Sequence, residues 1–393
     1  MKKIPTVHDI DVKNKKVFLR VDFNVPLVNG KIADELRIEA AVPTIEYLLD
    51  QNAALILASH LGRPDGKKDA KFSLEPVAAA LSEILDRPVE FIDDCIGEEV
   101  EEKATALKPG QILLLENLRF YAAEEANEEK FTEQLASLAE VYVDDAFAVI
   151  HRAHASLVGV PKLLPAAMGL LVQKEYETIT SLLDKPQRPF LAIIGGAKVS
   201  TKIEVLESLI KKADTIVIGG AMANTFLYAL GHDMASSVLE ADQVEVVKRV
   251  MTQARTAGVE IVLPVDLVVA SEASDSAAAR VCSLDELSGS DKAFDVGPQT
   301  TKLIEESVVK NTTIFWNGPL GFTEIEQFAK SSTALAHQLT KVQAEVIIGG
   351  GDTASFIDGL GWHDKYDFVS TGGGASLELL AGKKLPGIEV LRK

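Results

Sequence analysis

The sequence is poor in cysteine and in long apolar runs, and each absence excludes a class of protein. Its two cysteines, Cys95 and Cys282, lie far apart without the spacing of metal ligands, which is typical of proteins of the reducing cytoplasm. No stretch of 18 or more uncharged apolar residues occurs, so no membrane-spanning helix is predicted. The first residues lack the apolar core and cleavage site of a secretory signal, and we therefore expect a cytoplasmic location.

Positive charge is also scarce. The chain has 40 lysines and arginines against 58 aspartates and glutamates, which gives a formal net charge of −18. This excess of negative charge argues against nucleic acid or an anionic membrane as a partner. A small anionic ligand is still compatible with it, provided that a local cluster of basic groups binds the ligand.

Two common nucleotide-binding motifs are missing from the sequence. The stretch GGAKVS lacks the G-x-x-x-x-G-K-[ST] spacing of a P-loop. No G-x-G-x-x-G follows a predicted strand, which weakens the interpretation of the chain as a dehydrogenase that uses a dinucleotide.

Short apolar runs alternate with helical patterns along nearly the whole chain, whose composition, 47% apolar and 25% charged, is globular. Runs that are apolar on both faces and separated by helices predict parallel sheets covered on each side, so the expected fold class is α/β. We expect strands at 16–24, 54–60, 112–117, 141–147, 190–197, 215–220, 260–264, 312–318, 345–352 and 368–374. We expect helices at 38–50, 74–85, 128–140, 200–212, 241–257 and 299–310.

A domain boundary is predicted near the stretch LLDKPQRPF. A helical pattern over about 170–183 ends before Pro186 and Pro189, which bracket a charged linker ahead of a new strand. The sequence therefore predicts two α/β domains joined by a helix.

The strands of the second half end in glycines, and ligands of parallel α/β sheets bind outside the carboxyl ends of the strands. The stretches 349–355 and 370–376 place three glycines each before a helix, where backbone N–H groups can bind an anion. Asp352 could help to hold Mg²⁺ carried by a nucleotide, and we expect Lys198 and Lys202 on one face of the following helix. The alternative is that these glycines only permit tight turns and close helix packing.

The strands of the first half end in charged or polar groups instead. Basic residues fall at or just after the predicted strand ends: Arg37, His60, Arg63, Arg119, His151, Arg152 and His154. Arginine offers a rigid fork of donors suited to carboxylate and phosphate, although each arginine singly could equally be a member of a surface ion pair, and each histidine a structural group.

Acidic and amide side chains occur at the same strand ends. Asp22 and Asn24 could cap a turn or accept hydrogen bonds from a substrate hydroxyl. For Asp144 and Asp145, which could form an acid/base pair, we favour a structural role. A small anion on one domain and a Mg-nucleotide on the other predict phosphoryl transfer, which needs positioning and charge neutralisation more than a nucleophile supplied by the enzyme. Domain closure would also exclude water.

Over essentially the whole chain, the sequence is similar to the phosphoglycerate kinases of bacterial type. The motifs RVDFNVP, ASHLGRP, LENLRF, HRAHAS, GGAKV, WNGP, GGGDT and STGGGASLE occur in the order that the family has. The resemblance implies a glycolytic kinase, a transferase that reversibly transfers a phosphoryl group between 1,3-bisphosphoglycerate and ADP to give 3-phosphoglycerate and ATP, with Mg²⁺ bound to the nucleotide. It further implies a monomer of two Rossmann-like domains with a cleft between them that closes by hinge bending.

The resemblance also implies domain bounds and site residues. The N-terminal triose-phosphate domain is expected at 1–171, with a tail at about 380–393 packed back on it, a linker helix at 172–185 and the nucleotide domain at 186–379. The triose site would comprise Asp22, Phe23, Asn24, Arg37, His60, Leu61, Gly62, Arg63, Arg119 and Arg152. The nucleotide site would comprise Lys202, Ala293, Glu324, Gly350, Gly351, Asp352 and Thr353, with Asp352 near the metal. The catalytic groups would be Arg37, Lys198, Lys202, Gly372 and Gly373.

Several positions depart from the family pattern. Ala148, Val149 and Ile150 are bulkier than the usual residues ahead of the HRAH motif, and we expect them to bear on the loop that carries Arg152. Changes that bear on nucleotide fit are Phe322, Thr323, Ala221, Asn224 and Ala293, the last at a position where many members have a glycine that contacts the nucleotide. Because the charged groups expected to touch phosphate are retained, an active kinase is the leading hypothesis, ahead of a dehydrogenase or a binding protein without turnover.

Overall fold

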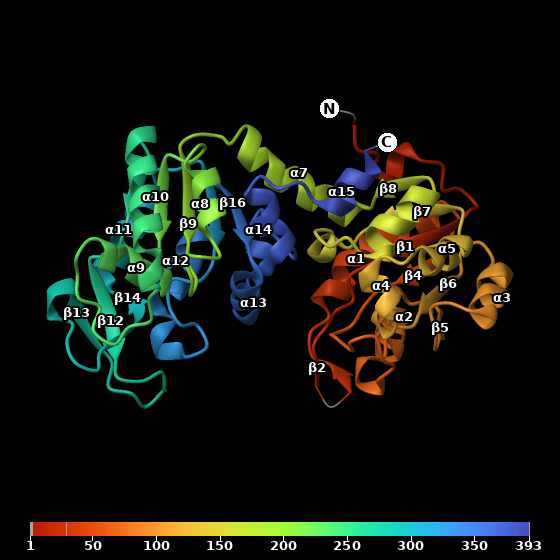
Figure 1. The fold of residues 1–393 in the computed structure, drawn as a ribbon, viewed down its shortest axis with the longest axis horizontal. Coiled ribbons are helices and arrows are strands. Elements are labelled where there is room, and N and C mark those ends of the chain that lie inside the picture. Colours follow the sequence, from red (N-terminus) through yellow and green to blue (C-terminus); the bar gives the residue numbers. More distant parts are fainter. Residues whose placement is uncertain (1–2, 29, 393) are drawn as a thin grey trace. The chain divides into compact units, whose positions relative to one another are not determined.

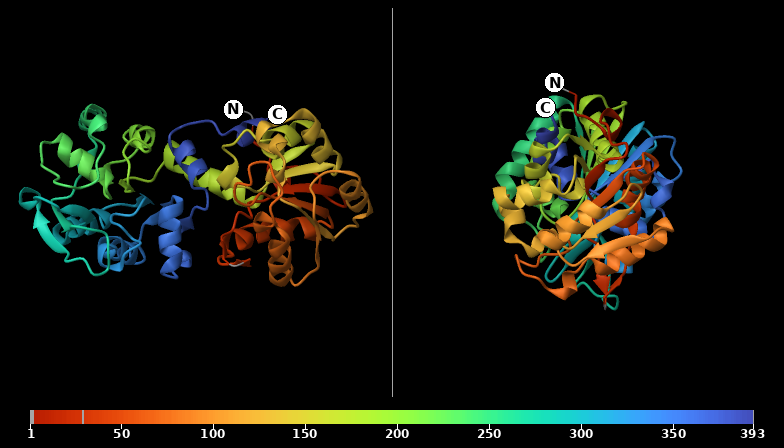
Figure 2. Two further views of the ribbon diagram at one scale, coloured as in Figure 1. Left: turned by 60° about the horizontal axis from the view of Figure 1, so that its bottom comes forward. Right: turned by 90° about the vertical axis from the view of Figure 1, so that its right-hand side faces the viewer.

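The computed structural model describes residues 3–28 and 30–392, which divide into two compact units. The first unit comprises 1–178 with 384–393, and the second comprises 179–383. Helix α7 (Leu170–Asp184) contains the boundary between them. The first and the last described segments of the chain, 3–28 and 384–392, both belong to the first unit (Figures 1 and 2). No helix within the described residues is long and apolar enough to cross a membrane.

The first unit is built on a six-stranded parallel sheet, with the strand order β5-β6-β4-β1-β7-β8. Its central strands are buried on both faces, as expected of apolar runs in a parallel sheet covered by helices. The strands are β1 (Lys16–Arg20), β4 (Ala54–Ala58), β5 (Val89–Ile92), β6 (Ile112–Leu115), β7 (Val141–Asp144) and β8 (Ala166–Met168). The short hairpin of β2 (Leu27–Val28) and β3 (Lys31–Ile32) lies outside this sheet.

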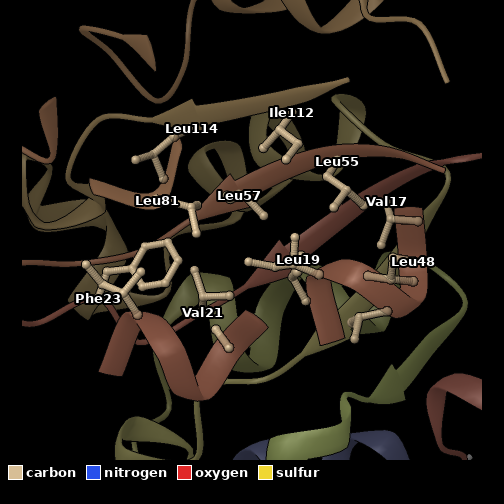
Figure 3. Close-up of a cluster of buried hydrophobic side chains, with 14 of the residues drawn as sticks. Val17, Leu19, Val21, Phe23, Leu48, Leu55, Leu57, Leu81, Ile112 and Leu114 are labelled. Carbon is tan, nitrogen blue, oxygen red and sulfur yellow. The ribbon is translucent and has the colours of Figure 1, made fainter. Parts of the chain in front are cut away.

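Helices of the first unit supply the other half of its core. One face of the sheet packs on α1 (Leu36–Asp50) and α2 (Glu75–Leu85) through alternate strand residues such as Leu19, Leu57 and Leu114 (Figure 3). The remaining helices are α3 (Glu98–Ala106), α4 (Ala122–Ala126), α5 (Glu129–Ser137), α6 (Val160–Leu163) and, from the end of the chain, α15 (Pro386–Leu391). Helix α15 contacts β8 and the π-helical turn Ala155–Gly159, and Figure 1 shows it beside β8.

The second unit repeats this plan with another six-stranded parallel sheet, in the order β11-β10-β9-β15-β16-β17. Its strands are β9 (Phe190–Ile194), β10 (Thr215–Ile218), β11 (Glu260–Val262), β15 (Thr313–Asn317), β16 (Glu345–Gly349) and β17 (Phe368–Val369). Its helices are α8 (Ile203–Leu209), α9 (Met222–Ala229), α10 (Val244–Ala257), α11 (Pro298–Val308), α12 (Lys330–Leu339), α13 (Gly351–Gly359) and α14 (Gly374–Leu380). The expected α/β class with two parallel sheets is confirmed.

A small antiparallel sheet adds to the second unit a feature that the sequence pattern did not predict. It has the order β13-β12-β14, with β12 (Asp266–Ala270), β13 (Arg280–Ser283) and β14 (Lys292–Val296). One of its faces packs on a separate apolar cluster that includes Leu227 of α9.

Candidate active site

In the first unit, polar residues follow four adjacent strands of the sheet, β6, β4, β1 and β7. Asp22 follows β1, His60 follows β4, and Arg119 lies in the single turn of 3-10 helix, Leu118–Phe120, after β6. Because the carboxyl ends of parallel strands share one edge, the chain brings these side chains to the same side of the sheet.

Asp22 is the centre of the contacts at this edge. Its carboxylate is 7% exposed and pairs with the Arg37 guanidinium from the first turn of α1. It also accepts from the backbone N–H of Asn24 at 3.3 Å and lies 3.7 Å from Nδ1 of His60. A buried carboxylate needs such partners, so the pair with Arg37 orients both side chains before any ligand arrives.

Asn24 and Arg119 attach the neighbouring turn to this centre. The side-chain oxygen of Asn24 accepts from the backbone N–H of Gly62 at 2.8 Å, and Arg119 Nη1 donates to the Gly62 carbonyl oxygen at 2.9 Å. Gly62 has a φ of +61°, and an added Cβ there would overlap the Phe72 ring. Glycine is therefore required at this turn by both conformation and space. Burial lowers the pKa of Arg119, and the arginine still keeps its charge.

The other expected triose-site residues are placed differently. The side chains of Phe23 and Leu61 are buried, and the Phe23 ring lies in the core shown in Figure 3, so these two residues can meet a ligand only through backbone groups. Arg63 and Arg152 are exposed, and within residues 3–28 and 30–392 neither side chain has a hydrogen bond or ion pair. Their free guanidinium groups are available to an anion, but the contacts that connect Asp22, Asn24, Arg37, His60, Gly62 and Arg119 do not include them.

The sequence interpretation missed a set of buried polar residues behind this edge. Arg20, the last residue of β1, is 1% exposed, and its Nε donates to Ser156 Oγ at 2.9 Å. Ser156 in turn bonds to Glu124, which is also 1% exposed. The one available signal was the arginine inside the otherwise apolar run VFLRV. The partners are distant in sequence, which hides the set from any local pattern.

Asp144, the last residue of β7, and Asp145, which follows it, are fully buried, and both carboxylates accept hydrogen bonds from the backbone of the first unit. Asp145 accepts from the N–H of Leu171 at 2.9 Å, and so caps α7. Asp144 accepts from the N–H of Ala146 at 3.1 Å. Burial raises the pKa of Asp145 to about 7 and that of Asp144 to about 6, because neither carboxylate has a basic partner strong enough to offset desolvation.

In the second unit, the expectation that Lys198 and Lys202 share one face of a helix is wrong. Helix α8 begins at Ile203, so both lysines lie in the irregular turn that follows β9. Gly196 within this turn has a φ of +115°, which a right-handed helix cannot accommodate. As a result Lys198 is exposed, whereas Lys202 is half-buried and reaches Oδ1 of Asn317 at the end of β15.

The contact between Lys202 and Asn317 belongs to a cluster at the ends of β15 and β16. Nδ2 of Asn317 is buried without a partner in the described chain and points at Gly350, where an added Cβ would lie 2.9 Å away. Thr353 Oγ1 accepts from the backbone N–H of Gly318 at 2.7 Å and ties α13 to the same loop. Burial lowers the pKa of Lys202 to about 8, while the nearby Asp352 carboxylate favours its charged form. Asn317 is a site residue that sequence reasoning missed.

The glycines at the ends of these strands serve two separate purposes. A Cβ on Gly195 would overlap the carbonyl oxygens of Gly318 and Pro319, and one on Gly220 would overlap Gly196. These glycines are therefore required for the loops to pack on one another, as the structural alternative holds. Gly351 differs, because a Cβ there would meet nothing within 4 Å and its φ is not in the left-handed region. Neither packing nor conformation explains a glycine in the first turn of α13.

The triple glycine at the start of α14 also contains two different positions, Gly372 and Gly373. The N–H of Gly372 donates to Ser370 Oγ at 3.1 Å and is thus engaged within the protein. Gly373 precedes the helix with a φ of +46°, and its N–H has no hydrogen bond within the described residues. Of the two amides implied by the resemblance, Gly373 is the one left available to a ligand.

The remaining nucleotide-site candidates lie around the small sheet and the loop after β15. Glu324 is exposed, and Phe322 is 39% exposed with its ring 6.3 Å from that of Phe294. Ala293 packs on the apolar cluster of the small sheet, and its N–H donates to Ser237 Oγ at 2.9 Å. Asn224 of α9 is buried and bonds to the Val238 carbonyl oxygen at 3.0 Å, so its amide is used in the fold. Within residues 3–28 and 30–392, no hydrogen bond or ion pair links any of these side chains to Lys202, whose side chain bonds to Asn317.

No group of three or more histidine, cysteine, aspartate or glutamate side chains within the described residues could hold a metal ion. Asp352, in the first turn of α13 near Lys202, is a single carboxylate. One carboxylate suits Mg²⁺ whose other ligands are phosphate oxygens and water, which is how a nucleotide carries it.

Three comparisons with known proteins point to the same family. The model of the family described as phosphoglycerate kinase matches residues 7–383. The chain is 47% identical over 386 residues to the phosphoglycerate kinase of Pelotomaculum thermopropionicum and 50% identical over 386 residues to that of Moorella thermoacetica, with 98% of each chain covered in both cases. Among solved structures it is similar to the phosphoglycerate kinase of Coxiella burnetii, at 40% identity, 99% coverage of each chain and a TM-score of 0.89. The enzyme from Pyrococcus horikoshii gives 32% identity, 98% coverage of each chain and a TM-score of 0.86.

Proposed function

Because the chain belongs to the phosphoglycerate kinase family and catalyses reversible phosphoryl transfer between 1,3-bisphosphoglycerate and ADP, we propose that its two units hold one substrate each. The triose phosphate binds at the strand ends of the first unit, and the Mg-nucleotide binds at the strand ends of the second. The hydrogen-bonded and ion-paired residues around Asp22 support the assignment of the triose-phosphate site to the first unit. They bring basic groups together at one sheet edge of a strongly acidic chain.

In the triose site, the oriented groups divide the recognition of 3-phosphoglycerate between them. Arg37 and Arg119 are fixed by Asp22 and by the Gly62 carbonyl oxygen, so they bind carboxylate or phosphate oxygens without first losing side-chain freedom. Asp22 and Asn24 accept from the substrate hydroxyl. Arg63 and Arg152, which are exposed and unpaired within the described residues, close on the phosphate as flexible cations.

In the nucleotide site, Lys202 and the turn from Gly350 to Thr353 bind the phosphates. The amides at the start of α13 provide donors, and the helix dipole favours negative charge there. Asp352 would hold Mg²⁺ together with the nucleotide phosphates, and the ion would neutralise phosphate charge when bound. Glu324 binds the ribose of the nucleotide. Ala293 lies beside the nucleotide base, where its methyl group occupies space that a glycine would leave open.

The transfer itself requires positively charged groups and hydrogen-bond donors around the moving phosphoryl group, which is negatively charged. Arg37 approaches this group from the triose side, while Lys198 and the Gly373 N–H approach it from the nucleotide side. Lys198 is exposed in a turn that contains Gly196, so it can follow the group as the bond to one oxygen breaks and the bond to the other forms. We propose that closure of the domains accompanies binding of both substrates and excludes water.

The test is ADP release from Mg-ATP with and without 3-phosphoglycerate, with a coupling system that removes the acyl phosphate. We expect release only when 3-phosphoglycerate is present. Arg37→Ala and Lys198→Ala should each lower kcat by roughly 100-fold and change substrate binding much less, since their contacts strengthen in the transition state. The exposed Lys310 provides a control, and Lys310→Ala should leave kcat unchanged. Full turnover in Arg37→Ala would refute the role given to that residue.

We also propose that the enzyme is a cytoplasmic monomer. The negative net charge and the composition support a protein that stays soluble without a partner. Light scattering in solution should return the mass of one chain, 42.3 kDa, and a mass of twice that value would refute the proposal.

A further inference from the structure

Arg20, Ser156 and Glu124 form a buried chain of hydrogen bonds that ends at His60. Arg20 Nη1 donates to the Val21 carbonyl oxygen, and its Nη2 lies 3.3 Å from His60 Nδ1. On its other side, Arg20 Nε donates to Ser156 Oγ at 2.9 Å. Ser156 Oγ is 2.5 Å from Glu124 Oε1, and the Ser156 N–H donates to Oε2 at 2.9 Å.

The position of each proton in this chain follows from the chemistry of arginine. A guanidinium group has only donors and does not lose its proton in proteins. Ser156 Oγ must therefore accept from Arg20, and its own hydrogen points to Glu124. By the same reasoning, Nδ1 of His60 must accept from Arg20, so a neutral ring carries its hydrogen on Nε2.

Burial makes this arrangement hard to exchange for another. Arg20 and Glu124 are each 1% exposed and His60 is 2% exposed, so water cannot replace a lost partner at little cost. Removing Ser156 Oγ would leave a buried charge without one of its acceptors, and the guanidinium group would be free to turn away from His60. No protein group bonds to Nε2 of His60 within residues 3–28 and 30–392.

The charges around His60 act against its protonation. The ring faces Arg20 of β1, Arg37 of α1, Arg119 after β6 and His154 of the turn after β7, with Asp22 as the acidic neighbour. Burial, together with these positive groups, lowers the pKa of His60 well below its usual range. Burial raises the pKa of Glu124, and the positive charge of Arg20 opposes that rise.

We propose that Arg20, held in place by Ser156 and Glu124, is a positioning residue that fixes His60 as the neutral tautomer with its hydrogen on Nε2. His60 then offers the triose substrate one hydrogen-bond donor and no charge, which matches a substrate oxygen that accepts. This inference rests on the proposed placement of the triose site. Arg20 and Glu124 act through His60 and need not touch the substrate.

The direct test is ¹⁵N NMR of the full-length protein labelled at histidine, because the ring nitrogen shifts report which nitrogen carries the hydrogen. We expect Nε2–H with Nδ1 as an acceptor, unchanged between pH 6 and 9, and a shift of Nε2 when 3-phosphoglycerate is added. A hydrogen on Nδ1 would overturn the proposal. If the enzyme is active and the hydrogen is on Nε2, but the Nε2 shift does not change when 3-phosphoglycerate is added, the placement of the triose site is overturned. The positioning role of Arg20 is then overturned as well.

Variants of Ser156 and Glu124 test whether the buried hydrogen bonds to Arg20 affect binding of the substrate. Ser156→Ala and Glu124→Gln should each raise KM for 3-phosphoglycerate by about tenfold with a much smaller change in kcat, as expected for one lost charge-assisted bond. The matched control is Ser73→Ala, which removes a 2.7 Å bond to the buried carboxylate of Glu116 in the same unit and has no contact with Arg20. Equal KM values in Ser156→Ala and Ser73→Ala would overturn the proposal.

His60 itself allows a rescue experiment that does not depend on the buried residues. The amide nitrogen of glutamine can occupy the place of Nε2 and is a neutral donor at every pH. His60→Gln should therefore keep KM for 3-phosphoglycerate within about threefold of the wild type, whereas His60→Ala should raise it by about tenfold. Equal losses in the two variants would show that more than a neutral donor is needed and would overturn the proposal.

Discussion

Gly351 and Gly359 begin and end the same helix, α13, and together they separate a structural from a functional need for glycine. At both positions an added Cβ would meet nothing within 4 Å, and neither φ is in the left-handed region. Alanine should thus be accommodated at both. Since alanine favours a helix over glycine by roughly 0.5–1 kcal/mol, each substitution should raise stability, by less than this at the helix ends.

The two positions should differ in nucleotide affinity. Gly351 lies beside Asp352 and the Gly350 turn that faces Asn317, where we propose that the phosphates approach the backbone. A methyl group there would displace the phosphates from the amide donors and from Lys202. The loss of one charge-assisted hydrogen bond, about 1.5–3 kcal/mol, corresponds to a roughly 10- to 140-fold rise in Kd for Mg-ADP.

The assay is titration calorimetry of Mg-ADP on both variants, with thermal unfolding measured in parallel. We expect Gly351→Ala to unfold at or above the wild-type temperature and to bind weakly, and Gly359→Ala to unfold similarly and bind normally. Equal affinity of the two variants for Mg-ADP would refute the interpretation of α13 as a phosphate-binding helix. A destabilised Gly351→Ala protein would refute the claim that the space at this position is open.

Three further outcomes follow from buried groups and close loops. The pKa of Asp145 is raised from 3.8 to about 7, so between these pH values the folded state binds a proton that the unfolded state does not bind. The free energy of unfolding therefore falls as pH rises through this window. Hydrogen exchange in α7 should show that the wild type loses about 2 kcal/mol of stability relative to Asp145→Asn between pH 5 and 7. Gly195→Ala, whose Cβ would overlap the Pro319 carbonyl oxygen, should lower the free energy of unfolding by roughly 1–3 kcal/mol in urea titration, opposite in sign to Gly351→Ala. Because the pKa of Lys202 is about 8, Mg-ADP affinity should fall as pH rises through this value, and Lys202→Arg should abolish that dependence.

The central strands of the two sheets could be predicted from the sequence because they are buried on both faces and therefore form continuous apolar runs. The edge strand β5 is only partly buried and was not predicted. The small antiparallel sheet gave no such signal. Strand β13 is exposed at three of its four residues, including Val281 at 53%, so its pattern resembles a polar loop. The three-residue strand β8 was equally hidden, because the sequence AAM suits a helix as well as a strand.

The polar site could be predicted only where a side chain directly follows a strand. Asp22, His60 and Arg119 were identifiable in this way, because the end of an apolar run marks the ligand edge of a parallel sheet. The buried groups behind them were not. Ser156 is 136 positions from Arg20 in the sequence, and only the folded sheet brings the two together. The spacing of Lys198 and Lys202 was misleading for a related reason, since a four-residue interval fits a helix but Gly196 makes the segment a turn.

The bulky residues ahead of the HRAH motif are accommodated by the end of the chain. Ile150 is fully buried, and its carbonyl oxygen accepts from the N–H of Gly387 at 3.0 Å. A Cβ on Gly387 would overlap the Ile150 side chain, so the glycine of α15 leaves the space that the isoleucine fills. Val149 packs in a small cluster with Ala146 and Leu157. Both side chains thus turn into the first unit and away from the exposed Arg152, and the extra volume reaches the substrate loop only through the core beneath it.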